Sequence, residues 1–302
     1  MFGGLAGKVA IVTGGAGGLG SAAARRLSAE GCRVLVVDRD GDGARRVAAE
    51  LPGDSAWAAA DVAREDDVQG YLDVAAERFG QVDLHHINAG IPGSTGGFPD
   101  LDVAEFDQVM AVNVRGVFLG LRGAFRRYRQ QGSAGSVVVT ASIASLRGSA
   151  DLIAYQTSKH AVLGLLRGAA MYGGPLGIRV NAVAPGIVPT NLFPAGGSTP
   201  GGRDDMVQRA ATSPLRRAGT PDEIASVVAF LLSDESAYMT GEVVSVDGGA
   251  AIMSTVRPSG GAGAWDFGGL DQRTYLPGGW SGVGGGRWIG ADSEADTGSG
   301  EE

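Results

Sequence analysis

The sequence predicts an α/β fold: a single doubly wound, Rossmann-like domain with about seven parallel strands and helices on both faces of the sheet. Two observations carry this prediction. Short runs of β-branched and apolar residues alternate along the chain with longer segments of helical periodicity. Most of the short runs lack polar alternation, which is typical of strands that are covered on both faces. A strand–helix–strand order of this kind favours a parallel sheet between two helical layers.

The predicted elements follow one another through the first 250 residues. The strands are 8–13, 33–38, 55–60, 82–88, 136–141, 179–184 and 243–246. The helical patterns between them include 20–30, 64–80, 102–131 and 155–173. We therefore expect residues 1–250 to form one dinucleotide-binding and catalytic domain, which is within the ordinary size range for a domain.

Residues 251–302 differ in composition from the rest of the chain. They contain 14 of the 52 glycines, three of the four tryptophans and no helical period. Three arginines and seven acidic residues give this tail −4 of the net charge of −8. Gly-rich, acidic ends are usually flexible, whereas large aromatic rings usually pack against a surface. Two expectations stand for the tail: a flexible segment, or an arm that contacts its own or a neighbouring subunit.

The composition also limits the compartment and the partners. A net charge of −8 has the wrong sign for binding nucleic acid or an anionic membrane. No apolar stretch approaches the roughly 20 residues that span a bilayer. The first strand pattern starts at Lys8, which leaves no room for a signal peptide, and Cys32 is the only cysteine. We expect a cytoplasmic protein without disulfides or a thiolate zinc site.

The residues from Thr13 to Gly20 form a glycine-rich turn, TGGAGGLG, between the first strand and the first helix. Glycines there allow the backbone to approach a pyrophosphate at the helix N-terminus. Asp38 ends the second strand, where an acidic side chain accepts hydrogen bonds from the adenosine ribose. It would repel the 2′-phosphate of NADP by about 4 kcal/mol at 4 Å. The predicted cofactor is NAD, with Arg39 as the nearby cation that argues otherwise; the alternative is a plain turn with Asp38 as a helix cap.

Four polar residues form the candidate catalytic set. Tyr155 and Lys159 are four residues apart, so on a helix they project from one face. The chain has only two lysines against 23 arginines, and a compact ammonium suits a position beside a phenol and ribose hydroxyls. Ser142 follows the strand 136–141, at the edge where open α/β sheets bind ligands. Asn113 lies in a helical stretch, in which Asn is a mediocre helix former.

In order and spacing, these residues resemble the Asn-Ser-Tyr-Lys tetrad of the short-chain dehydrogenase/reductase family. The Thr-Gly-x3-Gly-x-Gly turn, Asn88-Ala89-Gly90, the segment PGIVPT at 185–190 and VDGG at 246–249 extend the resemblance over residues 8–249. One position departs from the pattern, because Ile87 stands where the family has the first Asn of Asn-Asn-Ala-Gly.

The resemblance implies hydride transfer between NAD(H) and a secondary alcohol or ketone. Tyr155 would be the acid/base, with its pKa lowered by the positive charges of Lys159 and of an oxidised nicotinamide. Ser142 would hold the substrate oxygen, and Asn113 would hold a water that links Lys159 to solvent. The resemblance also assigns cofactor contacts to Tyr155 and Lys159 and to these residues: Gly14, Gly18, Leu19, Gly20, Asp61, Val62, Asn88, Ala89, Gly90, Pro185, Gly186, Val188 and Thr190. It implies that Asp61 and Val62 contact the adenine, and that Thr190 and the Val188 backbone hold the nicotinamide.

The substrate is predicted less sharply than the cofactor. The expected lining, besides Ser142 and Tyr155, is Ser94, Ala144, Leu152 and Leu192, with the segment 192–206 as a lid. Such a lining suggests an uncharged or apolar alcohol or ketone. Two alternatives remain: a non-catalytic NAD-binding sensor or assembly protein, and an NADPH-dependent 3-oxoacyl-type reductase.

Two further features complete the expectations. His85 and His86 are adjacent on a strand, so they point to opposite faces and are predicted to be buried polar residues rather than metal ligands. The segments 102–131 and 155–173 carry more apolar residues than one core-facing stripe needs, such as Phe118 and Phe125. In the family these two helices pair with their copies, which implies a homotetramer, with a dimer as second choice.

Overall fold

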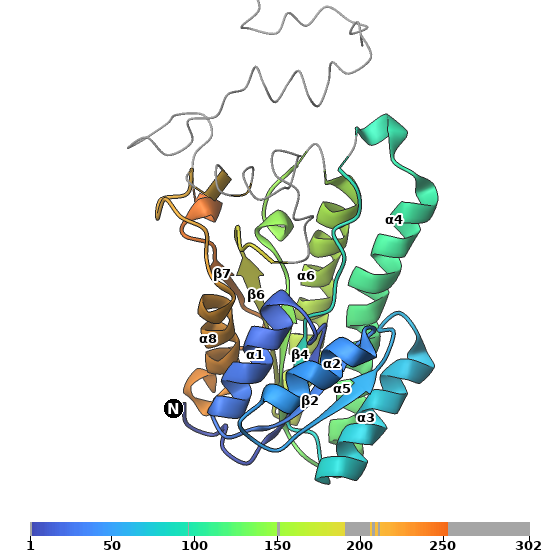
Figure 1. Ribbon diagram of the computed structural model, residues 1–302, viewed down its shortest axis with the longest axis vertical. Helices are drawn as coiled ribbons and strands as arrows, with labels where there is room; N and C mark the ends of the chain where they lie inside the picture. Colours follow the sequence, from blue (N-terminus) through green and yellow to red (C-terminus); the bar gives the residue numbers. More distant parts are fainter. Residues whose placement is uncertain are drawn as a thin grey trace, which may run out of the picture. The chain divides into compact units, whose positions relative to one another are not determined.

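The computed structural model describes residues 2–95, 97–149, 152–190, 206, 209–210 and 212–252. In this part of the chain, seven parallel strands form one sheet in the order β3-β2-β1-β4-β5-β6-β7 (Figure 1). The predicted doubly wound sheet is therefore confirmed. The crossover that moves the chain from β3 to β4 places β1 and β4 side by side in the middle of the sheet, where this fold binds its ligands.

The strands lie close to their predicted positions. They are β1 (Val9–Thr13), β2 (Arg33–Asp38), β3 (Ser55–Ala59), β4 (Leu84–Ile87), β5 (Gly135–Thr140), β6 (Ile178–Pro185) and β7 (Val243–Val246). The largest difference is at β4, which is shorter than the predicted 82–88. The Val82 amide donates to the side chain of Gln131, and the Asn88 amide donates to the Thr13 hydroxyl. Outside the strand, the amides of Val82 and Asn88 thus bond side chains instead of the backbone of a neighbouring strand.

Seven helices accompany the strands in the described residues. They are α1 (Gly18–Ala29), α2 (Gly41–Glu50), α3 (Glu65–Phe79), α4 (Val103–Met110), α5 (Gly116–Gln131), α6 (Ile153–Gly173) and α8 (Pro221–Leu232). The single helix predicted over 102–131 is wrong in detail, because a π-helical turn, Ala111–Arg115, separates α4 from α5. The side chain of Asn113 in that turn binds both backbone groups of Ile91, which holds the wider turn in place.

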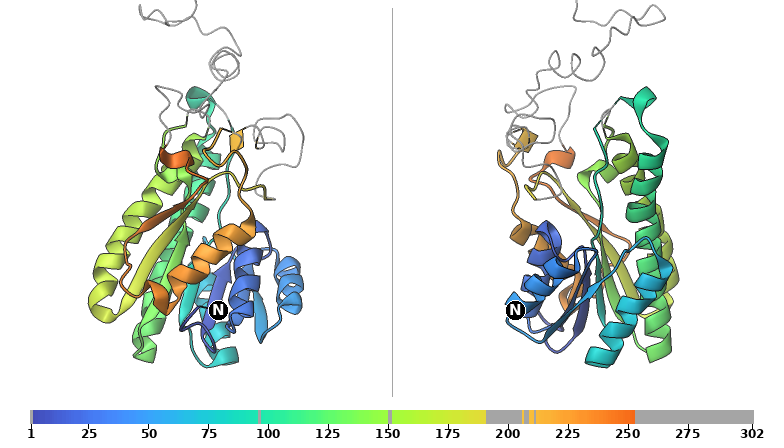
Figure 2. Two further views of the ribbon diagram at one scale, coloured as in Figure 1. Left: turned by 90° about the vertical axis from the view of Figure 1, so that its left-hand side faces the viewer. Right: turned by 45° about the vertical axis from the view of Figure 1, so that its right-hand side comes forward.

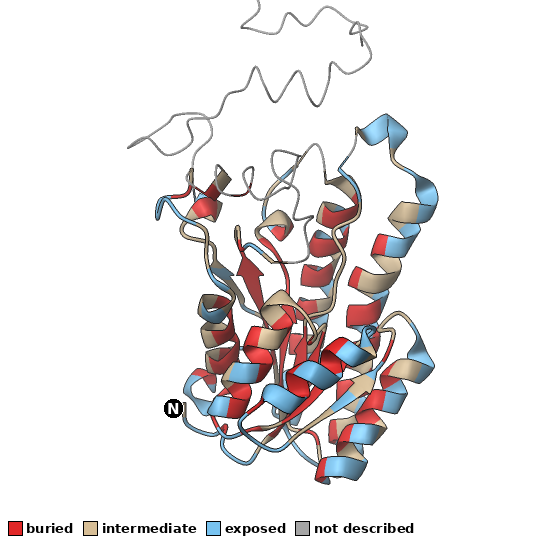
Figure 3. Cartoon of the chain, in the orientation of Figure 1, coloured by how far each residue is buried: buried red, intermediate tan, exposed pale blue. Residues whose placement is uncertain are grey.

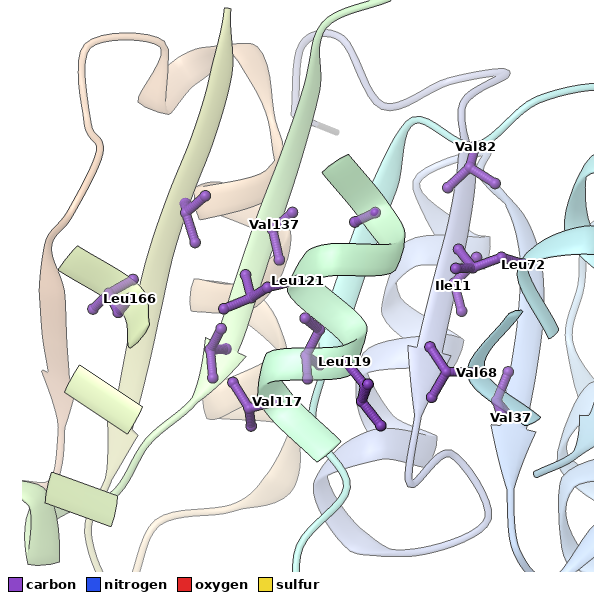
Figure 4. Packing of buried hydrophobic residues seen from close by; sticks show 14 of the residues in the cluster. Ile11, Val37, Val68, Leu72, Val82, Val117, Leu119, Leu121, Val137 and Leu166 are labelled. Atoms are coloured by element: carbon purple, nitrogen blue, oxygen red, sulfur yellow. The ribbon is translucent and has the colours of Figure 1, made fainter. Parts of the chain in front are cut away.

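The helices form two layers with the sheet between them (Figure 2). Buried residues of α1, α2 and α8 pack on one face of the sheet, and those of α3, α5 and α6 pack on the other. Figure 4 shows the buried residues on the side of α3, α5 and α6, where Leu121 of α5 lies beside Val137 of β5. The central strands β1 and β4 are buried along their whole length (Figure 3), whereas the edge strands β3 and β7 are half-exposed because each has a neighbour on one side only.

The two histidines of β4 lie as predicted. His85 and His86 pair with Ile11 and Val12 of β1, and both side chains are buried. His85 bonds the hydroxyl of Tyr71, and His86 bonds the hydroxyl of Thr140. Their separate partners confirm that they are buried polar residues on opposite faces of the sheet.

The chain is described as far as a short 3-10 helix, Ala250–Ile252. The predicted arm from residue 253 onward, including its three tryptophans, lies outside the described residues. Within the described ranges, no helix has both the length and the apolar character needed to cross a bilayer.

Candidate active site

The candidate site lies where the carboxyl ends of β1, β4, β5 and β6 meet. The glycine turn follows β1, Asn88-Ala89-Gly90 follows β4, Ser142 follows β5, and the segment 186–190 follows β6. Because parallel strands all end at one edge of the sheet, four segments that are distant in sequence are brought together there.

The glycine turn requires glycine at several positions because it packs tightly on neighbouring backbone. Gly14 adopts a φ of +63°, and a Cβ on it would lie 2.9 Å from the Cα of Ala89. A Cβ on Gly20 would lie 2.0 Å from the Gly14 carbonyl oxygen. Gly17 precedes α1 in open space and caps the helix with no side chain. The first amides of α1 are therefore accessible to an anion such as a pyrophosphate.

The segment after β6 lies against this turn. Thr190 packs over Gly18, since a Cβ on that glycine would lie 2.8 Å from the Thr190 Cβ. Gly186 approaches the backbone of Asp247, and Val188 is buried. The structure thus brings PGIVPT, predicted to hold the nicotinamide, next to the predicted phosphate-binding turn.

Asp38 is held beside the turn by backbone amides. Its Oδ2 accepts a hydrogen bond from the Ala16 amide at 3.0 Å, and its Oδ1 accepts one from the Asp40 amide at 3.0 Å. Both bonds hold the carboxylate in place at the end of β2. The side chain of Arg39 is exposed and forms no hydrogen bond or ion pair with other described residues.

Asp61 and Val62 follow β3 as predicted, in a turn with partners of its own. Asp61 Oδ1 accepts from the Ala63 amide at 2.9 Å, while the Asp61 amide donates to Asp67. Val62 packs against Gly116, since a Cβ on that glycine would lie 2.9 Å from the Val62 Cγ2. These contacts show a structural role in the turn, and the adenine contact of both residues stays a prediction.

Asn88 anchors the turn after β4 despite the isoleucine that precedes it. Its Nδ2 donates to the carbonyl oxygens of Thr13 and Gly14, at 3.1 and 3.3 Å, and its Oδ1 accepts from the Thr140 hydroxyl at 3.0 Å. Ile87 is buried and packs against Gly120 of α5. Gly90 leaves space in front of Lys159, since a Cβ there would lie 3.6 Å from its Nζ.

The four candidate catalytic residues are all buried and come from three elements. Tyr155 and Lys159 lie on α6, and the Lys159 Nζ is 5.6 Å from the centroid of the Tyr155 ring. Ser142 caps the 3-10 helix Ile143–Ser145. Asn113, in the π-helical turn, donates to the hydroxyl of Ser158 at 2.9 Å, which in turn donates to the Tyr155 carbonyl. Sequence reasoning missed Ser158, although its place between Tyr155 and Lys159 could have drawn attention to it.

The electrostatics of Tyr155 differ from the expectation. Burial raises the pKa of its phenol, and only a hydrogen bond with Ser142 acts in the opposite direction. The expected lowering by Lys159 is therefore wrong for the protein alone. The Lys159 ammonium donates to the carbonyl of Thr140 at 2.8 Å, and burial lowers its pKa to about 8. At neutral pH the phenol carries its proton and the lysine is mostly charged.

The predicted substrate residues are placed unequally. Ala144 and Leu152 are half-buried next to Ser142 and Tyr155 in the chain, and the Ala144 amide donates to the Ser142 hydroxyl at 3.1 Å. Ser94 is exposed, and its amide donates to the Glu105 carboxylate. Leu192 and the predicted lid 192–206 lie outside the described residues, except for a buried residue at 206.

Known proteins that are similar to this chain include reductases and dehydrogenases. The chain matches, over residues 14–251, a family described as enoyl-(acyl carrier protein) reductase. Levodione reductase of Leifsonia aquatica is 40% identical over 252 residues, which cover 80% of this chain and 93% of that protein. The (−)-isopiperitenol/(−)-carveol dehydrogenase of Mentha piperita is 38% identical over 255 residues, covering 83% and 96%.

Solved structures give the same result. A crystal structure of levodione reductase superposes with a TM-score of 0.74 at 37% identity, covering 82% of this chain and 99% of that one. The NADH complex of 3-ketoacyl-(acyl-carrier-protein) reductase from Brucella melitensis gives 0.75 at 32% identity, with the same coverage. NAD+-bound xylitol dehydrogenase gives 0.73 at 33% identity, covering 82% and 100%. Fold and sequence are therefore similar over nearly the whole length of these enzymes.

Proposed function

The chain belongs to the short-chain dehydrogenase/reductase family, whose similar members are alcohol and ketone oxidoreductases, and from this premise we propose that it is an NAD(H)-dependent secondary-alcohol dehydrogenase/ketone reductase. The observation that carries the proposal is the placement of Tyr155 and Lys159 on one face of α6. Both are buried at the carboxyl edge of the sheet, with Ser142 hydrogen-bonded to the phenol. A protein that only binds a cofactor has no need of this phenol, so the non-catalytic alternative is not favoured.

The residues present suit a dinucleotide. The accessible start of α1 fits the pyrophosphate, Asp38 the adenosine ribose, and Lys159 the nicotinamide ribose. When bound, the nicotinamide supplies or accepts the hydride. Leu19, Gly20 and Ala89 line the same turns, and Pro185 begins the segment proposed to hold the nicotinamide.

Proton transfer follows from the position and the protonation of Tyr155. In the direction of reduction, the phenol donates its proton to the carbonyl oxygen of the substrate while the Ser142 hydroxyl holds that oxygen. In oxidation, the phenolate removes the alcohol proton. Lys159 favours the phenolate when its ammonium lies near the phenol. Asn113 holds the first turns of α6 in place through its hydrogen bond to Ser158, which donates to the Tyr155 carbonyl. We retain the water link from Asn113 to Lys159 as part of the proposal.

The preference for NAD rests on Asp38. Its carboxylate is held by the Ala16 and Asp40 amides and cannot turn away from a 2′-phosphate without losing both hydrogen bonds. The repulsion is on the order of a few kcal/mol at the effective dielectric of a protein surface. An NADPH-dependent 3-oxoacyl-type reductase is the second candidate, because a 3-ketoacyl-(acyl-carrier-protein) reductase is among the similar structures, although that one holds NADH.

The substrate is proposed to be an uncharged, mostly apolar alcohol or ketone. Ala144 and Leu152 flank the reacting groups, and neither brings a charge into the site. Levodione reductase and carveol dehydrogenase, by their names, act on small molecules of this kind, which supports the proposal.

Assembly is proposed from the outer face of α5 and α6. An open groove of about 940 Å³ lies between these helices, away from the catalytic residues, and includes Phe118, Phe125, Tyr172 and Leu176. Phe118 and Tyr172 are exposed there, and exposed apolar rings favour burial against another surface. We propose a homotetramer in which these helices pair with a second copy, with a dimer as second choice.

Two further assignments are proposed on sequence grounds. Residues 1–250 form the catalytic domain, and residues 251–302 form a tail that is either flexible or an arm on a neighbouring subunit. A cytoplasmic location is proposed because Cys32 is the only cysteine, so the sequence offers no disulfide framework of the kind found in proteins of oxidising compartments.

The experiment that tests the function is a panel of secondary alcohols and ketones, assayed with NAD(H) and NADP(H) in both directions. Turnover with NADH that exceeds turnover with NADPH, and that Tyr155→Phe removes, is the expected result. Equal activity of the wild type and Tyr155→Phe would overturn the assignment, and a preference for NADPH would overturn the cofactor choice alone.

A further inference from the structure

The two histidines of β4 occupy equivalent environments but have different connections. Both are buried, and the Nδ1 atom of each has no hydrogen-bond partner in the described part of the chain. His85 Nε2 lies 3.3 Å from the Tyr71 hydroxyl of α3, and this contact leads no further. His86 Nε2 lies 2.9 Å from the Thr140 hydroxyl of β5, which belongs to a chain of hydrogen bonds that reaches the glycine turn.

The direction of every hydrogen bond in this series follows from Asn88, which lies at the end nearest the glycine turn. Asn88 Nδ2 lies against the carbonyl oxygens of Thr13 and Gly14, which only accept, so Asn88 Oδ1 is the atom that faces Thr140. The Thr140 hydroxyl uses its single proton to donate to that Oδ1, at 3.0 Å. Its oxygen must then accept from His86. His86 is therefore protonated on Nε2, and its unpartnered Nδ1 is bare.

The proton on Nε2 is also stable against changes in pH. Burial lowers the pKa of the His86 imidazole to about 3, so the ring is neutral wherever the protein is expected to be folded. His86 thus acts as a permanent neutral donor rather than as a switch.

Thr140 joins this chain to the catalytic lysine. Its side chain connects His86 to Asn88, while its backbone carbonyl accepts the hydrogen bond from Lys159 Nζ at 2.8 Å. The Thr13 hydroxyl closes the other end by donating to the His86 carbonyl and accepting from the Asn88 amide. Thr140 is therefore hydrogen-bonded both to Asn88, which holds the turn for the phosphates, and to Lys159, the lysine for the ribose.

We propose that His86 is a positioning residue for the cofactor: its Nε2–H donates to Thr140, orients the Thr140 hydroxyl and the Asn88 amide, and so fixes the Thr13–Gly14 backbone that receives the pyrophosphate. This inference rests on the proposed dinucleotide-dependent function. A donor at this position strengthens each following bond, because buried hydrogen bonds in a chain polarise one another.

The test compares three variants by NADH dissociation constant and thermal midpoint. His86→Leu removes the donor, His86→Gln keeps an amide donor close to the Nε2 position, and His85→Leu removes the equally buried neighbour that has no link to the turn. We expect His86→Leu to weaken NADH binding about five- to tenfold, the effect of losing roughly one hydrogen bond. His86→Gln should restore most of the affinity, and His85→Leu should lower the thermal midpoint without changing the dissociation constant.

Two results would overturn the proposal: equal loss of NADH affinity in both leucine variants, or no recovery in His86→Gln. If wild-type protein binds neither NADH nor NADPH, the proposed function fails instead, so the two failures are distinguishable. Should His86→Leu not fold, Thr140→Val and Thr140→Ser replace it, because valine removes the hydroxyl at nearly constant volume and serine retains it. NADH affinity that is lost in the valine variant and kept in the serine variant supports the proposed series of hydrogen bonds.

A spectroscopic measurement needs no variant in the site. The chain contains only three histidines, so ¹⁵N-histidine labelling gives a spectrum in which substitution of His85 and His160 leaves the His86 signals assigned. His86 should show the neutral Nε2–H form from about pH 5 to about pH 9. A neutral Nδ1–H form, or titration of this ring within that range, would contradict the bond directions on which the proposal depends.

Discussion

The carboxyl edge of the sheet and the outer face of α5 and α6 depart from the usual distribution of residues in opposite ways. At the edge, polar groups such as Asn113, Ser142 and Lys159 are buried. On the outer face, large rings such as Phe118 and Tyr172 are exposed. Polar groups are costly to bury and apolar rings are unfavourable in water, so each departure needs a compensating partner.

The difference lies in where that partner comes from. At the edge, the chain supplies most partners itself: Asn113 binds Ile91 and Ser158, and Lys159 binds Thr140. On the outer face, no described residue covers the rings. We interpret the first region as a site prepared within one subunit for a small ligand, and the second as the surface on which we propose that another copy packs. Each prediction below tests one side of this comparison.

The largest effect is expected at the edge, from Tyr155→Phe. General acid–base catalysis contributes about 10²- to 10⁴-fold, and no other described acid lies beside Lys159 on α6, so turnover should fall by about 10³-fold. NADH affinity should stay near the wild-type value, because the hydroxyl is not needed to hold the dinucleotide. Rates and NADH titrations on the folded variant give both numbers. Activity retained above a few per cent would show that the buried polar edge is not arranged around this phenol.

The next effect concerns cofactor choice. Asp38→Ser removes the charge at the 2′-phosphate position, with Arg39 exposed beside it, and should shift the ratio of kcat/KM for NADP to that for NAD by about 10- to 100-fold. Asp42→Ser, a nearby exposed carboxylate in α2 that pairs with Arg45, is the matched control and should leave the ratio unchanged. Equal use of both cofactors by the wild type would contradict the role given to Asp38.

Only part of the polar site at the carboxyl edge of the sheet could be predicted from the sequence. The four-residue spacing of Tyr155 and Lys159, and the position of Ser142 after a strand, are local patterns that the chain displays directly. The π-helical turn at Asn113 is not local, because it depends on the backbone of Ile91. The raised pKa of Tyr155 could not be predicted for the same reason. It follows from burial by segments distant in sequence, and the spacing of residues along the chain gives no information about that burial.

The same limit applies to the fold. Buried strands such as β2 and β5 were predicted almost to the residue, because uninterrupted β-branched runs mark them. The helical segments predicted from the sequence do not include α2 and α8, although Asp40 and Thr220 are helix caps that hydrogen-bond the first turn of each. For α8 the sequence TPDE carries a capping box and a proline at the first turn, so this helix could have been predicted.

A moderate effect is expected from pH. Burial lowers the Lys159 pKa to about 8, so its charge is present below that pH and is lost above it. The value of kcat/KM for NADH in ketone reduction reports the free enzyme and should fall as the pH rises above about 8. Burial raises the Tyr155 pKa, so the acid form persists through this range. Lys159→Arg keeps its charge at every pH used and should lose the inflection near pH 8, even if it is slower. An unchanged profile in that variant would assign the inflection to another group.

The smallest effect on catalysis, and the clearest on assembly, is expected on the outer face. Phe118→Glu places a charge in the α5–α6 groove, and burying that charge against a second copy is unfavourable. The variant should be of lower mass than the wild type in light scattering at micromolar concentration. Its activity per subunit should remain similar, because the groove contains none of the candidate catalytic residues. Trp57→Glu is the control: Trp57 is 44% exposed, against 47% for Phe118, but it lies on the edge strand β3. A wild-type protein that is already monomeric, or equal dissociation of both variants, would break the comparison, because the exposed rings of α5 and α6 would then have no distinct role.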